Sequence, residues 1–462
     1  DNATKSIGNT PNYSANLSFF ARASYSYGGR YSVQANFRAD AFDASKLSNK
    51  NRWGFFPSVS AGWTISNESW VKDNVSPAAL TFLKIRLSWG LNGNVAVLSG
   101  YPWRNTIAYQ GVYYQYGAAT GDGSTTFGSA PSGLANPDLR WETSDQWDVG
   151  LDAKFLNGRL SFGFDWYRKM TKDLLVEVNN LPALGVAKSY KNAGNVLNTG
   201  VEVELGWKDT VGDFSYSISG NFSYLQNKVT YLDSSVGRIE AAQGGDSANN
   251  LNHIRKAFEV GYPVWYFRGY EYAGHTDAGE ALYYNADGDK VSASDLRGGD
   301  DERYLGSAIP SFTYGVTINL EWKGIDFTLF GTGVAGNKLF DATNRDQANI
   351  NQYKWYYYNS WTPTNKTAYL PDPANVSGDN NVFYSSSACM FDGSYFKIKQ
   401  IQLGYTLPRQ WTKKALISQL RVFASLDDFV TFTKYPGLDP ETATMSQAER
   451  QGFDIGTYPI TR

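Results

Sequence analysis

The sequence contains very little cysteine and histidine and has no long apolar run. Among its 462 residues there is one cysteine, and the two histidines are His253 and His275. A single cysteine excludes a disulfide-stabilised scaffold, and with only two histidines beside it a Cys/His zinc site is not expected. No apolar run approaches the roughly 18 residues that a membrane-spanning helix needs.

An excess of either charge is also missing. The chain has 42 Lys and Arg against 44 Asp and Glu. Nucleic-acid-binding proteins carry a basic excess, so we expect no nucleic-acid partner. The negative mean hydropathy, taken alone, would indicate a soluble protein. Aromatic residues, in contrast, are abundant, with 14 Trp, 32 Tyr and 26 Phe. Disordered chains lack such large apolar groups, so the sequence predicts a folded protein.

The strongest pattern is an alternation of apolar and polar residues. Between positions 83 and 91 every odd position is large and apolar, and the positions between them are polar or glycine. The same alternation recurs at 147–155, 160–166, 201–207, 214–224 and 312–322. Successive side chains of a strand point to opposite faces, so each segment is predicted to be a strand with one apolar and one polar face.

Two architectures bury such strands, namely a soluble β-sandwich with a dry interior and a membrane β-barrel with a wet one. The segments are about ten or more residues long, which is near the length that crosses a bilayer at a tilt and longer than most soluble strands. Their apolar faces commonly end in Trp or Tyr, as an interfacial aromatic girdle requires. Five such tryptophans are Trp63, Trp89, Trp166, Trp207 and Trp322.

The links between strands alternate between short and long. Short links are expected at Gly28-Gly29, Asn157-Gly158, 208–213 and Lys323-Gly324, and long ones at 93–141, 171–195, 227–308 and 337–393. Outer-membrane barrels have this pattern of short periplasmic turns and long outer loops. The sequence therefore predicts an all-β protein, a transmembrane antiparallel β-barrel with long extracellular loops. The alternative is a secreted β-sandwich that binds carbohydrate or hydrolyses glycosides.

About twelve strands are predicted, and one further segment has a different pattern. Residues 67–81 suit a small amphipathic helix at the periplasmic rim, with Glu68, Trp70, Val71 and Leu80 on it. The predicted strands lie at 12–25, 30–40, 53–66, 82–92, 142–156, 159–170, 196–208, 213–226, 308–322, 325–336, 394–407 and 419–431.

Five stretches of this chain resemble the SusC/RagA-like family of TonB-dependent outer-membrane transporters, and they occur in the family's order. They are 52–68 (RWGFFPSVSAGWTISNE), 83–94 (LKIRLSWGLNGN), 136–142 (NPDLRWE), 393–408 (GSYFKIKQIQLGYTLP) and 432–441 (FTKYPGLDPE). The resemblance implies an N-terminal plug and a barrel of about 22 strands. Residues 1–462 are then expected to be the C-terminal portion of this barrel. The twelve strands would be the tenth to the twenty-first, with the plug, the early strands and the final strand outside the chain.

The resemblance also implies how such a protein works. It implies a bacterial outer-membrane location, active import of oligosaccharides or peptides, and a SusD-like surface lipoprotein that covers the barrel. Energy would come from the TonB complex through the N-terminal part that is not in this chain. The remaining partner is outer-membrane lipid.

Aromatic clusters in two long links are the candidate substrate-binding residues. Exposed rings around a cavity can stack on sugars or hold peptide side chains at little entropic cost. Packing of loop on loop, or against the lipoprotein, is the alternative reading of the same residues. The candidates are Tyr101, Trp103, Tyr113, Tyr114, Trp355, Tyr357 and Trp361.

One loop resembles a calcium-binding loop, in which oxygen ligands surround the cation around a glycine turn. Its candidate ligands are Asn285, Asp287, Asp289 and Asp295. However, Tyr283 stands where the first ligand should be and Ser294 where a bidentate Glu should be, which favours a solvated turn.

No enzyme motif stands out, so neither catalysis nor a cofactor other than calcium is expected. The segment 331–336 (GTGVAG) matches a dinucleotide-binding pattern, but no acidic residue follows at the required distance. Glycines that thin a strand near the barrel rim explain it better.

Overall fold

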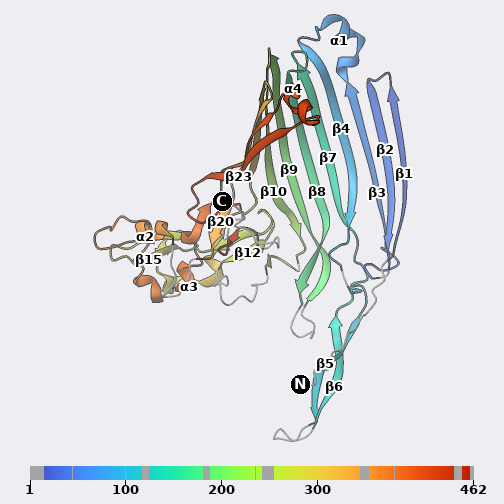
Figure 1. Cartoon of the computed structure of the whole chain (residues 1–462). Helices are drawn as coiled ribbons and strands as arrows, with labels where there is room; N and C mark the ends of the chain where they lie inside the picture. Colours follow the sequence, from blue (N-terminus) through green and yellow to red (C-terminus); the bar gives the residue numbers. More distant parts are fainter. Residues whose placement is uncertain are drawn as a thin grey trace, which may run out of the picture.

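The fold is dominated by one antiparallel sheet of twelve strands (Figure 1). The computed structural model describes residues 15–43, 45–98, 100–116, 124–180, 188–234, 236–241, 254–343, 353–378, 380–441 and 450–457. The strands of the sheet, in their order across it, are β1 (Asn16–Tyr27), β2 (Tyr31–Phe42), β3 (Trp53–Thr64), β4 (Leu80–Asn94), β7 (Glu142–Phe155), β8 (Leu160–Asn179), β9 (Lys188–Val211), β10 (Phe214–Leu232), β18 (Phe312–Trp322), β19 (Ile325–Ala335), β22 (Tyr395–Thr406) and β23 (Arg421–Thr433). Each of the twelve predicted strands coincides with one of them.

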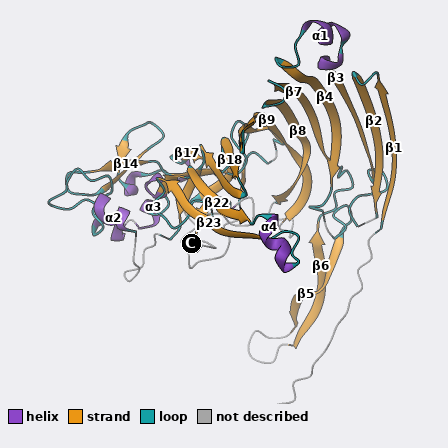
Figure 2. Cartoon of the chain, turned by 45° about the horizontal axis from the view of Figure 1, so that its top comes forward, coloured by secondary structure: helices purple, strands orange, loops and turns teal. Residues whose placement is uncertain are grey.

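The twelve strands form a single curved wall, which Figure 2 shows with the top of Figure 1 tilted forward. Neighbours in the chain are neighbours in the sheet, with β1 and β23 at its two edges. A β-sandwich would need two such sheets packed face to face. One continuous sheet with an up-and-down order is the wall of a barrel instead, and the sandwich alternative is therefore wrong. The barrel is not closed within the described residues.

The two faces of the wall differ as the alternation predicts. Leu87 pairs with Val149, Val149 with Trp166, and Trp166 with Val201, so these side chains form a row on one face. Leu87, Val149 and Trp166 are exposed despite being apolar. An apolar row across four strands that is not covered by protein is the lipid-facing surface of a barrel.

The neighbouring row on the opposite face carries ions. Arg86 Nη2 lies 2.9 Å from Asp165 Oδ1, and Arg86 Nε lies 2.7 Å from Asp152 Oδ2. The arginine reaches Asp165 across Gly150, where a Cβ atom would lie 2.3 Å from the carboxylate oxygen. Glycine at this position therefore makes room for an ion pair on the polar, lumen-facing side.

Tight turns close the strands at one end of the wall. Gly28 and Gly29 have φ of 58° and 62°, and Lys323 and Gly324 have φ of 48° and 87°. Positive φ at both central residues is the type I′ hairpin geometry, which matches the right-handed twist of the strands. The helix predicted within 67–81 is confirmed at this end as α1 (Ser69–Asn74), preceded by η1 (Ile65–Asn67) (Figure 1). The placement of Leu80 on this helix was wrong, because Leu80 begins β4.

One predicted long link, 171–195, was wrong in extent. Strands β8 and β9 continue through much of it, to Asn179 and from Lys188. The register shifts between Thr171 and Leu175, and Asp173 has a φ of 55°. This irregularity interrupts the alternation, so the period-two pattern in the sequence stops before the strand does.

The other long links carry small elements at the opposite end of the wall. The link between β4 and β7 forms a projecting hairpin of two strands (Figure 1). The other small strands form three small sheets. The described α-helices of these links are α2 (Lys354–Asn359) and α3 (Asn380–Phe383), whereas α4 (Arg409–Thr412) lies between β22 and β23 at the tight-turn end (Figure 1). These small strands are β5 (Thr106–Tyr116), β6 (Ser124–Gly133), β11 (Ile239–Glu240), β12 (Arg255–Phe258), β13 (Tyr266–Gly269), β14 (Tyr272–His275), β15 (Ala281–Tyr284), β16 (Lys290–Val291), β17 (Arg303–Gly306), β20 (Lys338–Asp341), β21 (Met390–Asp392) and β24 (Phe453–Asp454).

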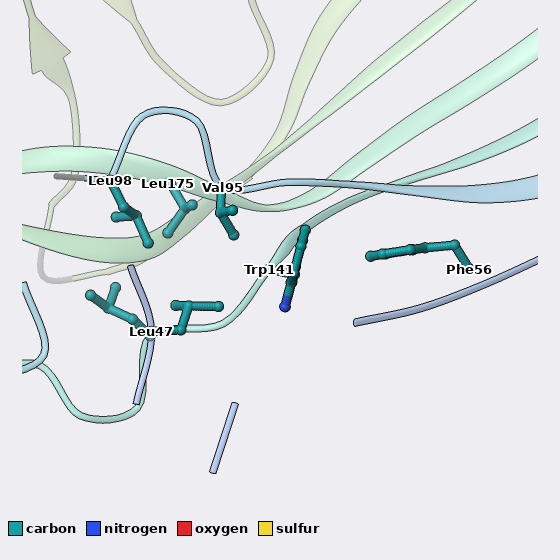
Figure 3. Packing of buried hydrophobic residues seen from close by; sticks show 7 residues of the cluster. Leu47, Phe56, Val95, Leu98, Trp141 and Leu175 are labelled. Atoms are coloured by element: carbon teal, nitrogen blue, oxygen red, sulfur yellow. The ribbon is translucent and has the colours of Figure 1, made fainter. Parts of the chain in front are cut away.

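Trp141 is the centre of a buried cluster at the long-link end of the wall (Figure 3). Its ring lies 5.3 Å from that of Phe56, and its Nε1 donates to the carbonyl oxygen of Arg52 at 3.1 Å. A Cβ at Gly54 or Gly93 would lie 2.4 Å and 2.0 Å from the Phe56 ring. The glycines of two of the family stretches are therefore needed for this packing. The cluster also contains Leu47, Val95, Leu98, Leu139 and Leu175.

A second compact region, which we call the loop body, consists of residues 254–308, 338–343, 353–378, 380–393, 434–441 and 450–457. It has two apolar cores of its own. One includes Phe267, Phe340 and Phe453, and the other includes Tyr283 and Tyr356. No described helix is long and apolar enough to cross a membrane.

Candidate substrate and partner site

Helix α2 is fixed to the loop body by the face that carries Trp355 and Tyr356. Tyr356 is buried, and its hydroxyl donates to Asp341 Oδ2 at 2.9 Å. The Trp355 ring meets Phe391 edge-on at a centroid distance of 4.9 Å. Burial raises the pKa of the Asp341 carboxyl, which Thr343 and Tyr356 nevertheless stabilise by hydrogen bonds. Helix α2 is therefore held in place by its contacts with the loop body.

The next two residues of α2 point out of the loop body. Tyr357 is 80% exposed and Tyr358 is 69% exposed. Their rings contact each other edge-on with centroids 5.3 Å apart. We call them the α2 tyrosine pair. Two large rings that stand free on an anchored helix can make contact with a ligand or partner without losing much conformational entropy.

The predicted residue Trp361 does not share the exposure of the α2 tyrosine pair. It is buried, and its Cδ2 atom would lie 2.8 Å from a Cβ atom at Gly279. Its backbone N–H donates to the Leu370 carbonyl at 3.0 Å. For this tryptophan the geometry agrees with loop-on-loop packing, whereas Tyr357 is open to contact.

His275 ties the chain that follows α2 to β14. Its Nδ1 and Nε2 atoms each lie 2.8 Å from a carbonyl oxygen, of Thr276 and Ala368 respectively. Tyr272 adds a hydrogen bond from its hydroxyl to the Tyr369 carbonyl at 3.0 Å. The surface around the α2 tyrosine pair is thus braced by contacts between residues almost 100 positions apart.

The other predicted aromatic group lies elsewhere. Tyr101 is exposed, and the guanidinium of Arg104 lies over the Trp103 ring at 4.3 Å. Tyr113 and Tyr114 lie in β5, but their side chains are outside the part of the chain that the structure describes. Figures 1 and 2 place the β5–β6 hairpin well away from α2. The structure therefore does not bring the two predicted groups together.

Three residues of the predicted calcium loop, Asn285, Asp287 and Asp289, lie in a tight turn between β15 and β16, whereas Asp295 follows β16 in the 3-10 helix η3 (Ala293–Asp295). The Asp289 N–H donates to Asn285 Oδ1 at 2.8 Å. Asp287 is paired with Arg297 at 3.0 Å, and Asp295 accepts from Ser292 Oγ at 2.8 Å. Within the described residues no group of three or more His, Cys, Asp or Glu could hold a metal ion.

Arg297 supplies the positive charge of this loop. Its guanidinium lies 2.9 Å from the buried Asp301 and also pairs with Asp287. The hydrogen bonds from Arg297 hold the pKa of Asp301 at about 2. The backbone N–H of Ala286 donates to the same carboxylate at 2.7 Å. With a guanidinium at its centre, this set of side chains fits calcium poorly, and calcium stays a prediction.

Two family stretches meet in a contact that the sequence alone did not reveal. The buried Lys397 Nζ lies 2.6 Å from both Asp439 Oδ2 and Glu441 Oε2. Tyr435, in the stretch 432–441, donates a hydrogen bond from its hydroxyl to the buried Asp454, and burial raises the pKa of Tyr435. The two acids follow the lysine by 42 and 44 positions, so no short stretch of the sequence predicts their contact. They fasten the segment after β23 to the wall.

Comparison with known proteins agrees with this architecture. A family profile for the β-barrel of TonB dependent receptor-like proteins matches residues 1–428. A TonB-dependent receptor of Formosa agariphila is 30% identical over 96% of this chain and 44% of its own length. TonB-dependent receptor SusC of Bacteroides thetaiotaomicron is 29% identical over 96% of this chain and 42% of its own length.

The fold is also that of a solved transporter. The structure of the RagAB peptide transporter superposes with a TM-score of 0.77, at 25% identity, over 96% of this chain and 46% of the matched chain. This chain thus spans less than half the length of the relatives it matches. It belongs to the TonB-dependent receptor β-barrel family of the outer membrane and is of SusC/RagA type.

Proposed function

We propose that this chain is the C-terminal part of the barrel of an outer-membrane transporter that imports oligosaccharides or peptides. A SusD-like surface lipoprotein would cover the long-loop end, and the TonB complex would drive import. In this proposal the chain supplies wall, lumen and loops and catalyses no reaction. The likeness to SusC and to a peptide transporter supports the proposal.

The observation that carries the proposal for this chain is the α2 tyrosine pair. Tyr357 and Tyr358 are exposed on a helix whose other face is buried. Exposed aromatic side chains with a rigid base are the groups that stack on sugar rings or grip peptide side chains. We therefore assign substrate or lipoprotein contact to this pair, with Trp355 as its support.

Uptake by the protein in its own bacterium tests this assignment. Replacing both Tyr357 and Tyr358 with Ala should lower uptake of the cargo at least about fivefold, because each lost ring contact is worth on the order of 1 kcal/mol. Growth on panels of oligosaccharides and of peptides identifies which class depends on the pair. Pull-down of the surface lipoprotein with the same variant separates cargo contact from partner contact.

A matched control is Tyr25→Ala, which removes an exposed tyrosine from the wall strand β1. It should leave uptake and lipoprotein binding unchanged. Uptake and lipoprotein binding both unaffected in the double α2 variant would refute the assignment.

A further inference from the structure

The connection between β22 and β23 forms a compact cationic turn at the tight-turn end of the wall. It contains α4 and the one-turn helix η7 (Lys413–Ala415). The Leu416 and Ile417 N–H groups donate to the carbonyls of Lys413 and Thr412, both at 3.1 Å. Thr412 is buried beneath the turn. These hydrogen bonds fix the backbone of the turn and therefore the directions of its exposed side chains.

The outer side of this turn is positively charged. Arg409, Lys413 and Lys414 are exposed, and no ion pair within the described residues involves any of the three. Residues 408–420 contain no Asp or Glu. Three cations without an acidic neighbour in the same turn form a local positive charge, in a chain whose overall charge is nearly balanced.

The same turn exposes large apolar side chains. Trp411 is 61% exposed and Leu416 is 96% exposed. Leu416 has a φ of 58°, the left-handed conformation that usually belongs to glycine at the end of a helix. A leucine there is unfavourable in water on two grounds, backbone strain and exposure. An apolar medium around the side chain removes the cost of exposure and gains free energy that offsets the backbone strain.

The turn lies at the level where the wall leaves the membrane. The Thr406 N–H, at the end of β22, donates to the carbonyl of Gly324 in the neighbouring tight turn at 2.7 Å. The exposed Trp322 stands beside that turn, and the exposed Trp70 lies on α1 at the same end (Figure 1). Exposed tryptophans near the strand ends at one end of a barrel are typical of a membrane interface.

We propose that this turn binds the headgroups of anionic phospholipids in the periplasmic leaflet. Arg409, Lys413 and Lys414 contact the lipid phosphates, while Trp411 and Leu416 enter the adjacent acyl region. Basic residues beside an interfacial apolar anchor are the general means of recognising an anionic membrane surface. This site is independent of the cargo and lies at the opposite end of the wall from the α2 tyrosine pair.

Lipid titration followed by native mass spectrometry tests the proposal on the protein purified whole from its outer membrane. Phosphatidylglycerol should bind more tightly than phosphatidylcholine. Replacing Arg409, Lys413 and Lys414 together with Gln should weaken phosphatidylglycerol binding about tenfold or more and leave phosphatidylcholine unchanged. Trp411→Ala with Leu416→Asn should weaken both lipids.

Two control variants keep the test specific. The triple change Arg409→Lys, Lys413→Arg and Lys414→Arg retains the charge and should retain binding. Lys354→Gln with Lys366→Gln removes two exposed cations at the other end and should have no effect. A gel shift on boiling confirms that every variant is a folded barrel.

Two results would overturn the proposal. One is a folded Gln variant that binds phosphatidylglycerol as tightly as the wild type. The other is full displacement of the lipid by inorganic phosphate at equal concentration, which would mean that the turn recognises a free anion rather than a lipid headgroup.

Discussion

Phenylalanines of the wall and of the loop body have opposite surroundings. Phe19 on β1 is 60% exposed, while Phe267 in the loop body is fully buried. Ionic side chains follow the same division. Arg86 pairs with acids that are themselves partly exposed in the lumen, whereas Lys256 and Asp301 of the loop body are buried.

This difference shows that the two regions obtain their stability in different ways. The wall is a continuous ladder of hydrogen-bonded strands whose apolar face requires lipid to cover it. The loop body buries its own apolar side chains and needs no lipid. Lys256 illustrates the second case, since its Nζ lies 3.5 Å from the centroid of the Phe267 ring and donates to the Trp265 carbonyl. Burial lowers its pKa well below the ordinary value.

The largest expected effect comes from emptying the core of the loop body. Phe267→Ala should lower the local free energy of unfolding by about 3–5 kcal/mol, because it removes a fully buried ring. Hydrogen exchange of the β20 and β24 amides measures this loss. The matched change Phe19→Ala on the wall should cost less than about 1 kcal/mol in detergent. Equal losses in the two regions would break the distinction between them.

A smaller effect is expected from acid, and it should be confined to the loop body. Arg297 lowers the pKa of Asp301 to about 2, so the folded loop binds fewer protons than the unfolded one below the ordinary pKa of Asp. The resulting stability is present above about pH 4 and is lost as the pH falls towards 2.

The exchange rates of the Ala286 and Arg297 amides report this loss directly, because both donate to Asp301. The ladder amides of β8 and β9 should keep their protection over the same range. Asp301→Asn should expose both loop amides at neutral pH and flatten their pH dependence. A wild-type profile that is flat between pH 4 and 2 would contradict the role given to Arg297.

The smallest effect is expected from calcium. Because Arg297 already pairs with Asp287 and Asp301, adding calcium or a chelator should leave the melting temperature of the loop body unchanged. Arg297→Gln is the informative companion, since it frees both carboxylates. A wild-type melting temperature that rises with the logarithm of calcium concentration would show that the ion binds after all.

The wall could be predicted from the sequence because its pattern is local. Alternation is visible within ten residues, and glycine pairs such as Gly28-Gly29 mark the turns. Prediction ended where the pattern was interrupted, as at Asp173, where an irregular register conceals the second half of β8. The reason for Gly54 and Gly93 was also hidden, because it depends on where the Phe56 ring lies.

The loop body could not be predicted in the same way. Its contacts join distant residues, such as His275 with Ala368 and Tyr272 with Tyr369. No short window contains both partners of such a pair. The run 355–358 of four aromatic residues predicts a contact surface, but a sequence cannot tell which rings of a short helix face inward.

The division of that run has an evolutionary consequence. Tyr356 is committed to the fold by its bond to Asp341, whereas Tyr357 and Tyr358 touch little besides each other. Selection can therefore exchange the outer two residues without paying in folding stability. Related receptors can therefore carry different side chains at these two positions of α2 while the loop body on which the helix packs stays the same.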